Sequence, residues 1–347
     1  GLYSHMLDKQ HFDFAKQCGC TDVVVHLVDY FYKGNQDNKN NQPIGDNSGW
    51  GIAGHTSDLW QYEKLLDIKK QIEDAGLTWA AIENFDPAHW YDVLLDGPRK
   101  QEQLEVLKQH IRTVGKVGIP VIGYNFSLAG VSSRITGPFA RGGAVSVGMD
   151  GVDNRPIPNG MIWNMVYDQE AAPGIVPPIS QDVLWQRLAY FLEELLPVAE
   201  EAGVQLAAHP DDPPMPEVRN TPRLVYQPHL YQKLLNLYPS KANKLEFCLG
   251  SIAEMTEGNV YEATRQYADH ISYIHFRNVK GKVPAYREVF VDEGDIDMGE
   301  IIRILREKNF QGVLIPDHTP QMSVEGGWYA GMAYALGYMK AAMNFIH

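Results

Sequence analysis

Four residues with metal-binding side chains stand at the ends of short apolar runs in the second half of the chain. His209 ends the first of these runs, and Pro210 follows at once, so the backbone must leave a sheet at that point. Cys248, His275 and Asp317 end three later runs in the same way. In a parallel α/β barrel the ends of successive strands meet at one face, where such barrels carry their chemistry. The pattern therefore predicts one site made of two imidazoles, a thiol and a carboxylate.

The four residue types do not select a single metal. Imidazole binds zinc, iron, nickel and manganese, whereas thiolate favours zinc or iron and carboxylate favours harder ions. A site at a barrel mouth must keep positions open for water or substrate, which favours a metal that accepts five or six ligands. Each residue alone also has a structural interpretation, as a buried polar group, a small core residue or a helix cap. Four at consecutive strand ends are harder to explain in that way, so we expect a divalent metal, with manganese, iron, zinc and cobalt open.

The composition is that of an ordinary globular protein with an acidic balance. The chain has 347 residues, 44% of them hydrophobic, and a net charge of -13. This charge argues against nucleic acid or an anionic membrane surface as a partner. No run of about 18 apolar residues occurs, so no transmembrane helix is expected. We expect a small-molecule partner bound in a local pocket, and a homo-oligomer is left open.

The cysteines give no sign of a disulfide framework. Cys18, Cys20 and Cys248 make an odd and low count, and the first two have the wrong spacing for a redox or zinc motif. A reducing, cytoplasmic setting fits this usage best. The chain opens with Gly1, and we expect residues 2–7 to be native sequence, because a barrel needs a strand before its first helix.

Strand-like and helix-like segments alternate along the chain. Apolar runs typical of buried parallel strands lie at residues 2–7, 23–28, 79–83 and 120–124 and before the four metal-ligand candidates. Helical patterns lie at residues 11–17, 59–75, 99–116, 183–202, 228–237, 260–267, 296–308 and 329–345. Eight alternations predict one α/β domain over residues 1–347, a (β/α)8 TIM barrel. Residues 33–56 and 127–180, rich in Gly and Asn, are expected to form long loops over the barrel mouth.

The segments around the four candidates resemble the mannonate dehydratase family. Order and spacing match at residues 209–214 (HPDDPP), 248–251 (CLGS), 275–279 (HFRNV), 294–298 (GDIDM) and 316–318 (PDH), and also at Pro222-Arg223 and residues 124–126 (YNF). The resemblance implies a xylose-isomerase-like barrel that binds a divalent metal, usually manganese. The reaction it implies is loss of water from D-mannonate to give 2-keto-3-deoxy-D-gluconate.

The resemblance also assigns roles to single residues. By position, His209, Cys248, His275 and Asp317 match the metal ligands, and His318 and Tyr329 match an acid–base pair. Elimination beside a carboxylate needs a base for the C2 proton and a group that protonates the leaving C3 hydroxyl, and histidine suits such proton transfer.

Several other polar residues are candidates for substrate binding. Arg277, two residues beyond His275, could hold a carboxylate with two parallel hydrogen bonds, and so could Arg223. The alternative for both arginines is a structural ion pair. Asn125 and Glu83 end strands four and three, His89 follows strand three, and His26 and His5 end the first two strands. These residues could bind substrate hydroxyls, or could simply be satisfied polar groups.

The sequence departs from the family around the presumed substrate pocket. After residues 124–126 the family continues with a Met-Pro segment and an Asp-Trp-Thr-Arg run, of which only Arg134 survives here, and Ile315 and Thr319 replace a usual Arg and Gly. We therefore expect retained metal chemistry with altered substrate recognition. The leading hypothesis is a sugar-acid dehydratase acting on D-mannonate or a related hexonate. A sugar isomerase or epimerase of the same superfamily and a non-catalytic sugar-acid binding protein are the alternatives.

Overall fold

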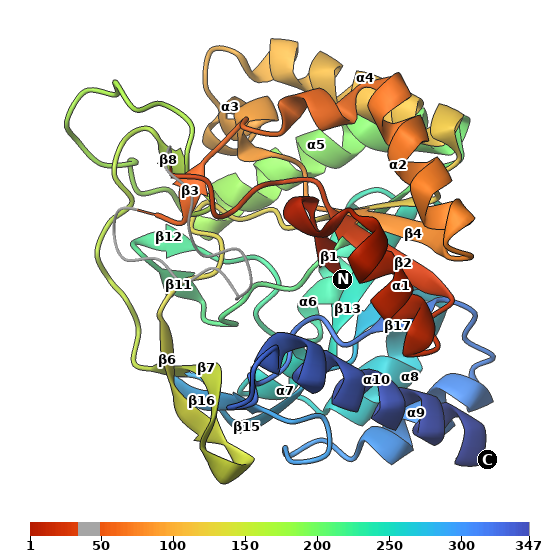
Figure 1. Cartoon of the computed structure of the whole chain (residues 1–347). Coiled ribbons are helices and arrows are strands. Elements are labelled where there is room, and N and C mark those ends of the chain that lie inside the picture. The colour runs from red at the N-terminus through yellow and green to blue at the C-terminus, as the bar shows by residue number, and fades with distance from the viewer. Residues whose placement is uncertain (34–48, 347) are drawn as a thin grey trace.

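The computed structural model describes residues 1–33 and 49–346, and its centre is a curled sheet of eight parallel strands (Figure 1). In sheet order the strands are β1 (Leu2–Tyr3), β2 (Asp22–His26), β4 (Thr78–Glu83), β5 (Val121–Tyr124), β10 (Gln205–Ala208), β13 (Asn243–Cys248), β14 (Ile271–His275) and β17 (Val313–Ile315). One buried cluster inside the curl joins side chains from both ends of this order: Val24, Ala81, Val121, Ala207, Tyr273 and Ile315. The predicted TIM-barrel-like α/β fold is confirmed.

Helices follow the strands and cover the outside of the sheet. The longer ones are α1 (Lys9–Gln17), α2 (Tyr62–Asp74), α4 (Lys100–Val117), α5 (Gln181–Ala202), α6 (Leu230–Leu237), α8 (Val260–Tyr267), α9 (Met298–Glu307) and α10 (Gly327–Phe345), and the short ones are α3 (Tyr91–Leu95) and α7 (Leu249–Glu254). In α4 the predicted apolar stripe is fully buried at Leu104, Leu107, Ile111 and Val114. Among the described helices, none is long and apolar enough to cross a membrane.

The predicted long loops contain more regular structure than expected. Residues 127–180 include the hairpin β6 (Arg134–Ala140) and β7 (Ala144–Asp150), which joins β16 (Ala285–Val289) and β15 (Asn278–Lys282) in an antiparallel sheet. They also include β8 (Met161–Ile162) and β9 (Met165–Val166), and β9 pairs with β3 (Gly51–Ile52). The prediction of an irregular stretch is therefore wrong, because its Gly and Pro residues obscure the alternation of two short strands.

The additional small sheets lie on one side of the barrel. Figure 1 shows β3, β8, β11 (Glu217–Val218), β12 (Thr221–Pro222) and the β6–β7 hairpin together on the left of the molecule. The predicted first strand is shorter than expected, because a 3-10 turn at Ser4–Met6 follows β1. Most of the predicted loop at residues 33–56 lies outside the described residues, since the description resumes at residue 49.

Two helical glycines test how tightly the helical layer is packed. A Cβ atom at Gly115 in α4 would lie 2.4 Å from the carbonyl oxygen of Ala202 in α5, whereas a Cβ atom at Gly337 in α10 would meet nothing within 4 Å. Gly115→Ala should therefore destabilise the fold by about 1–3 kcal/mol through overpacking. Gly337→Ala should stabilise it by up to about 1 kcal/mol through helix propensity. Urea unfolding measures both, and equal effects of the two substitutions would contradict the close approach of α4 to α5.

Candidate active site

Three of the four predicted metal ligands converge at the carboxyl ends of neighbouring strands. One ligand atom from each of His209, Cys248 and His275 lies within 4.8 Å of the other two. His209 follows β10, and its Nδ1 lies 2.6 Å from the Pro210 carbonyl oxygen. Because a carbonyl oxygen only accepts, that contact places a proton on Nδ1, so Nε2 is the ring atom that a metal ion would bind.

The Cys248 thiol is fully buried, and neighbouring charged groups favour its ionised form. Its sulfur accepts hydrogen bonds from the backbone N–H and the hydroxyl of Ser251, at 3.4 Å and 3.3 Å. Burial opposes ionisation, but the charge of Arg277 and a hydrogen bond from His209 hold the pKa of the Cys248 thiol well below its ordinary value. The thiolate is the form of cysteine that binds metal.

Asp317 follows β17, and its contact with this ligand group is made to His275. Its Oδ2 lies 3.4 Å from His275 Nδ1 and 3.0 Å from His318 Nε2. The backbone of Asp317 has a φ of 60°, a left-handed conformation that is unusual for an aspartate and turns the chain sharply after the strand. Both Asp317 and His318 consequently line the pocket above the strand ends.

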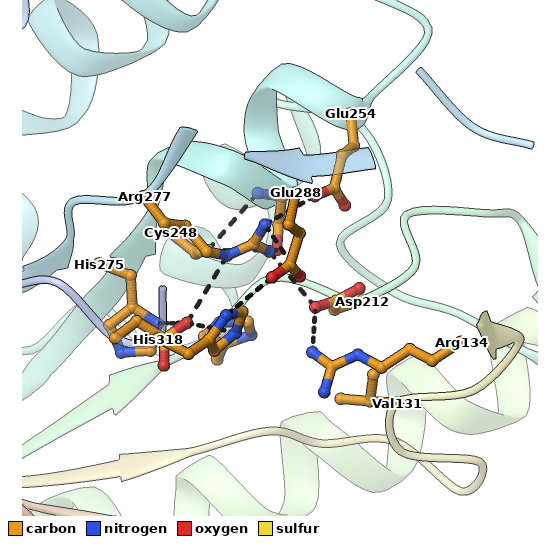
Figure 2. Close-up of polar contacts among 12 residues, drawn as sticks. Val131, Arg134, Asp212, Cys248, Glu254, His275, Arg277, Glu288 and His318 are labelled. Atoms are coloured by element: carbon orange, nitrogen blue, oxygen red, sulfur yellow. Dashed lines mark hydrogen bonds and ion pairs between the residues drawn. The ribbon is translucent and has the colours of Figure 1, made fainter. Parts of the chain in front are cut away.

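His318 is held between two carboxylates (Figure 2). Its Nδ1 lies 2.7 Å from Glu288 Oε2 on β16, and its Nε2 faces Asp317. Burial would lower the pKa of His318, but the charges of Asp317 and Glu288 outweigh burial and raise the pKa to about 9. In this arrangement the imidazole carries a proton at neutral pH.

Two predicted hydroxyl-binding residues also line this pocket. Glu83 ends β4, and its Oε2 lies 3.5 Å from the Nε2 atoms of both His26 and His275. Asn125, just beyond β5, donates to the Pro210 carbonyl oxygen at 3.1 Å and accepts from Trp163 Nε1 at 3.2 Å. His26, which ends β2, faces the same space. The His5 ring stacks on the ring of Tyr3, which ends the neighbouring strand β1.

The two arginines expected to hold a carboxylate make extensive contacts with protein groups. Arg277 donates to Glu254 Oε1 at 2.8 Å and to the Ser251 hydroxyl at 3.0 Å, and it lies 3.4 Å from Asp212. Arg223 is fully buried, and it donates to the carbonyl oxygens of Gly130 and Asp212, each at 2.7 Å. Both residues make the structural ion pairs weighed as the alternative, Arg223 with Asp211 at 3.2 Å, and their role in substrate binding stays a prediction.

Two further predicted residues lie away from the cluster. The Tyr329 hydroxyl contacts His11 Nε2 at 3.1 Å and accepts from Gln10 at 3.0 Å, so its ring lies against α1. His89 contacts the Ser57 hydroxyl at 2.7 Å and His110 at 3.2 Å. Neither residue is brought together with His318, and their predicted roles remain untested.

Sequence reasoning missed several groups that complete the site. Glu246 stands two residues before Cys248 on β13, so strand alternation puts both side chains on one face of the sheet. This spacing is the sequence pattern from which Glu246 could have been predicted as part of the site. Arg134 begins β6, its Nε is buried without a hydrogen-bond partner in the described structure, and it lines the pocket. Asp212 Oδ2 lies 3.3 Å from Arg134 Nη2, and a dashed line in Figure 2 marks this ion pair. The contributions of Glu254 and Glu288 depend on packing that no local pattern reveals.

The buried donor atoms fit a metal ion. Within the described residues, both ring nitrogens of His275 and Oε2 of Glu83 and Glu246 are buried without a hydrogen-bond partner. Unsatisfied buried polar groups of this kind are costly unless something binds them. Together with an ionised thiol and a neighbouring carboxylate, they form a donor set suited to a divalent cation.

Comparison with known proteins identifies the family of the chain. The family model of D-mannonate dehydratase (UxuA) matches residues 50–137 and 175–346. The mannonate dehydratases of Streptococcus pneumoniae and Streptococcus suis are each 34% identical over 278 residues, which cover 75% of this chain and 74% of the relative. This chain belongs to the D-mannonate dehydratase family.

Solved structures agree with this assignment. The crystal structure of mannonate dehydratase from Streptococcus suis serotype 2 superposes with a TM-score of 0.73 and 26% identity, covering 96% of this chain and 88% of that chain. A xylose isomerase domain protein from Planctomyces limnophilus gives a TM-score of 0.58 at 14% identity, covering 97% and 93%. The second likeness is one of fold alone. Residues 138–174, which carry β7, β8 and β9, fall outside the D-mannonate dehydratase match.

Replacing Cys248 tests the metal group directly. Cys248→Ser keeps the side-chain volume but exchanges a thiolate for a poor ligand, so metal affinity should fall by at least about tenfold. The metal-free protein should melt close to wild type, because barrel packing supplies most of its stability. Equilibrium dialysis with Mn²⁺ measures the affinity. Unchanged binding in Cys248→Ser would remove the thiolate from the ligand set.

Proposed function

We propose that the protein is a metal-dependent hydro-lyase that removes water from D-mannonate or a closely related hexonate and releases the 2-keto-3-deoxy acid. The observation that carries this proposal is the meeting of a thiolate–imidazole ligand group, the carboxylate-held His318 and the incompletely paired Arg134 at one pocket. The family relationship supports the same reaction. A neutral-sugar isomerase is less well supported, because a neutral substrate has no use for the free donors of Arg134.

His209, Cys248, His275 and Asp317 would hold the metal ion, for which manganese is the best candidate. A carboxylate and open positions at a barrel mouth favour a metal with more than four ligands, and iron, cobalt and zinc are the alternatives. When bound, the ion polarises substrate oxygens and stabilises negative charge that develops beside the carboxylate. The buried Arg277 fixes the neighbouring carboxylates, so the ligands are preorganised.

The reaction requires two proton transfers, and His318 is placed to take part in them. The C2–H bond and the C3–O bond break, an enol forms between C2 and C3, and tautomerisation gives the 2-keto acid and one water. The protonated His318, held by Glu288 and Asp317, can donate to the leaving C3 hydroxyl. An imidazole of the pocket lining, such as His26, would take the C2 proton and return it to C3, while the neutral His318 regains its proton from the enol hydroxyl.

Arg134 is the best candidate for the group that binds the substrate carboxylate. Its guanidinium is buried at the pocket wall, and among the described residues it forms one ion pair, with Asp212 at 3.3 Å. The Nε atoms of Arg134, Arg223 and Arg277 all lack a hydrogen-bond partner in the described structure, but the terminal nitrogens of Arg277 and Arg223 donate to several protein oxygens, whereas those of Arg134 contact Asp212 alone among the described residues. A carboxylate that accepts two N–H groups of Arg134 would satisfy the guanidinium.

A substrate panel tests the proposed function. Mn²⁺-loaded protein is incubated with hexonates, uronates and ketoses, and products are identified by NMR. A 2-keto-3-deoxy acid formed from a hexonate is the expected result. Isomerised ketoses or uronates with no dehydration would replace the proposal with the isomerase alternative, and no turnover of any compound would favour a binding protein.

Removal of His318 should separate catalysis from metal binding. His318→Asn should lower kcat by about 10²–10⁴, the usual contribution of a positioned acid or base. Metal content should stay unchanged, because His318 is outside the ligand set. Tyr329→Phe is the matched comparison, and kcat should stay near wild type, because its hydroxyl contacts α1. An equal loss in both variants would restore Tyr329 as a catalytic partner and require movement of the segment after β17.

Replacement of Arg134 should affect acids more than neutral sugars. Arg134→Met should raise KM for D-mannonate by about 10–150-fold, the worth of charge-assisted hydrogen bonds. Inhibition by the neutral analogue D-mannitol should change little, and Arg134→Lys should be intermediate. Arg287→Met is a control in the same sheet, because Arg287 donates to the Tyr286 carbonyl oxygen and packs on Phe139. Equal losses for acid and polyol would show that Arg134 acts only through the fold.

A further inference from the structure

A second group of potential ligands lies beside the Cys248 group and shares His275 with it, and its two carboxylates are not used by the proposed reaction. Ligand atoms of Glu83, Glu246 and His275 all lie within 4.8 Å of one another. His275 Nε2 is 3.2 Å from Glu246 Oε1 and 3.5 Å from Glu83 Oε2. These residues are at most 5% exposed, so solvent does not satisfy them.

The contacts in this group have the spacing of ligands around an ion. The described structure gives His275 Nε2 and Glu83 Oε2 no hydrogen-bond partner, although they lie 3.5 Å apart. Two donor atoms bound at about 2.1 Å to one ion, at tetrahedral or octahedral angles, are separated by about 3.0–3.4 Å. The separations found here are close to that range, and the atoms meet in ion-pair contacts of 3.2 Å and 3.5 Å.

The two nitrogens of the His275 ring face different carboxylates. Nδ1 lies 3.4 Å from Asp317 Oδ2, whereas Nε2 faces Glu83 and Glu246. One ion cannot be coordinated by both ring nitrogens, so the carboxylate pair is not an extension of the ligand set on the Nδ1 side. His26 extends the deeper group, since its Nε2 lies 3.5 Å from Glu83 Oε2.

The barrel interior is shaped to hold these carboxylates. Gly123 on β5 leaves the space that Glu246 occupies, because a Cβ atom there would lie 2.3 Å from Glu246 Oε2. Two carboxylates buried side by side repel each other and lose hydration, a cost that their ion pairs with His26 and His275 offset in part and that a divalent cation would offset further. Both also line the pocket that contains His209 and Asp317, so an ion can enter from the pocket.

We infer that Glu83, Glu246 and the Nε2 edge of His275, with His26 beside them, form a second divalent-cation site within the barrel. Its two carboxylates make it harder than the thiolate site, so it prefers Mn²⁺ or Mg²⁺ to Zn²⁺. His275 is shared between the two sites through its two nitrogens. This inference depends on the geometry of the described residues, and its test does not use turnover of any sugar acid.

Cobalt substitution separates the two sites in the wild-type protein. Metal-free protein is dialysed to saturation with Co²⁺ alone, bound metal is counted by mass spectrometry, and the near-ultraviolet thiolate-to-cobalt absorption is recorded. Two Co²⁺ per chain are expected, only one of which contributes the thiolate band. Saturation with a single ion would overturn the inference, and Mn²⁺ alone should give the same count as Co²⁺.

Variants assign each ion to its residues. Cys248→Ser should lose the thiolate band and retain one ion, whereas Glu246→Gln should retain the band and also bind one ion. Glu83→Gln is the second variant for the deeper site, in case Glu246→Gln fails to fold. Asp92→Asn removes a buried carboxylate of α3 and should still bind two ions. Two ions in both glutamine variants would overturn the assignment to Glu83 and Glu246.

Discussion

The rest of the site depends on the ion pairs made by the buried guanidinium of Arg277. It joins the exit of β14 to α7 through Glu254, to β16 through Glu288 and to the loop after β10 through Asp212. Gly250 makes room for it, because a Cβ atom there would lie 2.3 Å from its Nη1. One cation thus offsets several buried carboxylates, which would otherwise be too costly to desolvate. It also favours ionisation of Cys248, and so couples the acidic network to the ligand group.

Most of the fold could be predicted because buried parallel strands have a simple pattern in the amino-acid sequence. Continuous apolar runs marked the central strands, and the stripe at Leu104, Leu107, Ile111 and Val114 marked α4. The hairpin β6–β7 could not be predicted in this way. Its partner β16 lies more than a hundred residues further along the chain, so its pairing depends on contacts that no local window contains. Its Gly residues, needed for the turn at residues 141–143, made it resemble a loop.

The site could be predicted only as far as strand ends determine it. The positions of His209, Cys248 and His275 follow from where their strands stop, since parallel strands bring their carboxyl ends together. The function of an arginine does not follow from its position in that way. Arg277 and Arg134 both reach the barrel mouth, and only their partners distinguish a structural cation from one with donors to spare. Tyr329 illustrates the same limit, because a helix start can face α1 as readily as the pocket.

The charge of the site imposes a condition on any anionic substrate. Asp212, Glu288 and Asp317 already line or support the pocket, and the whole chain carries a net charge of -13. A sugar acid entering such a space is repelled unless cations are present, and a bound metal ion together with Arg134 would supply them. Metal and acid binding are therefore thermodynamically coupled, and each must strengthen the other by the same factor. Asp212 carries part of this coupling, because it contacts both Arg134 at the pocket wall and Arg277 beside Cys248. Recognition of the acid group by Arg134 on the β6–β7 hairpin, as proposed above, would thereby be linked to the centre that would perform the chemistry.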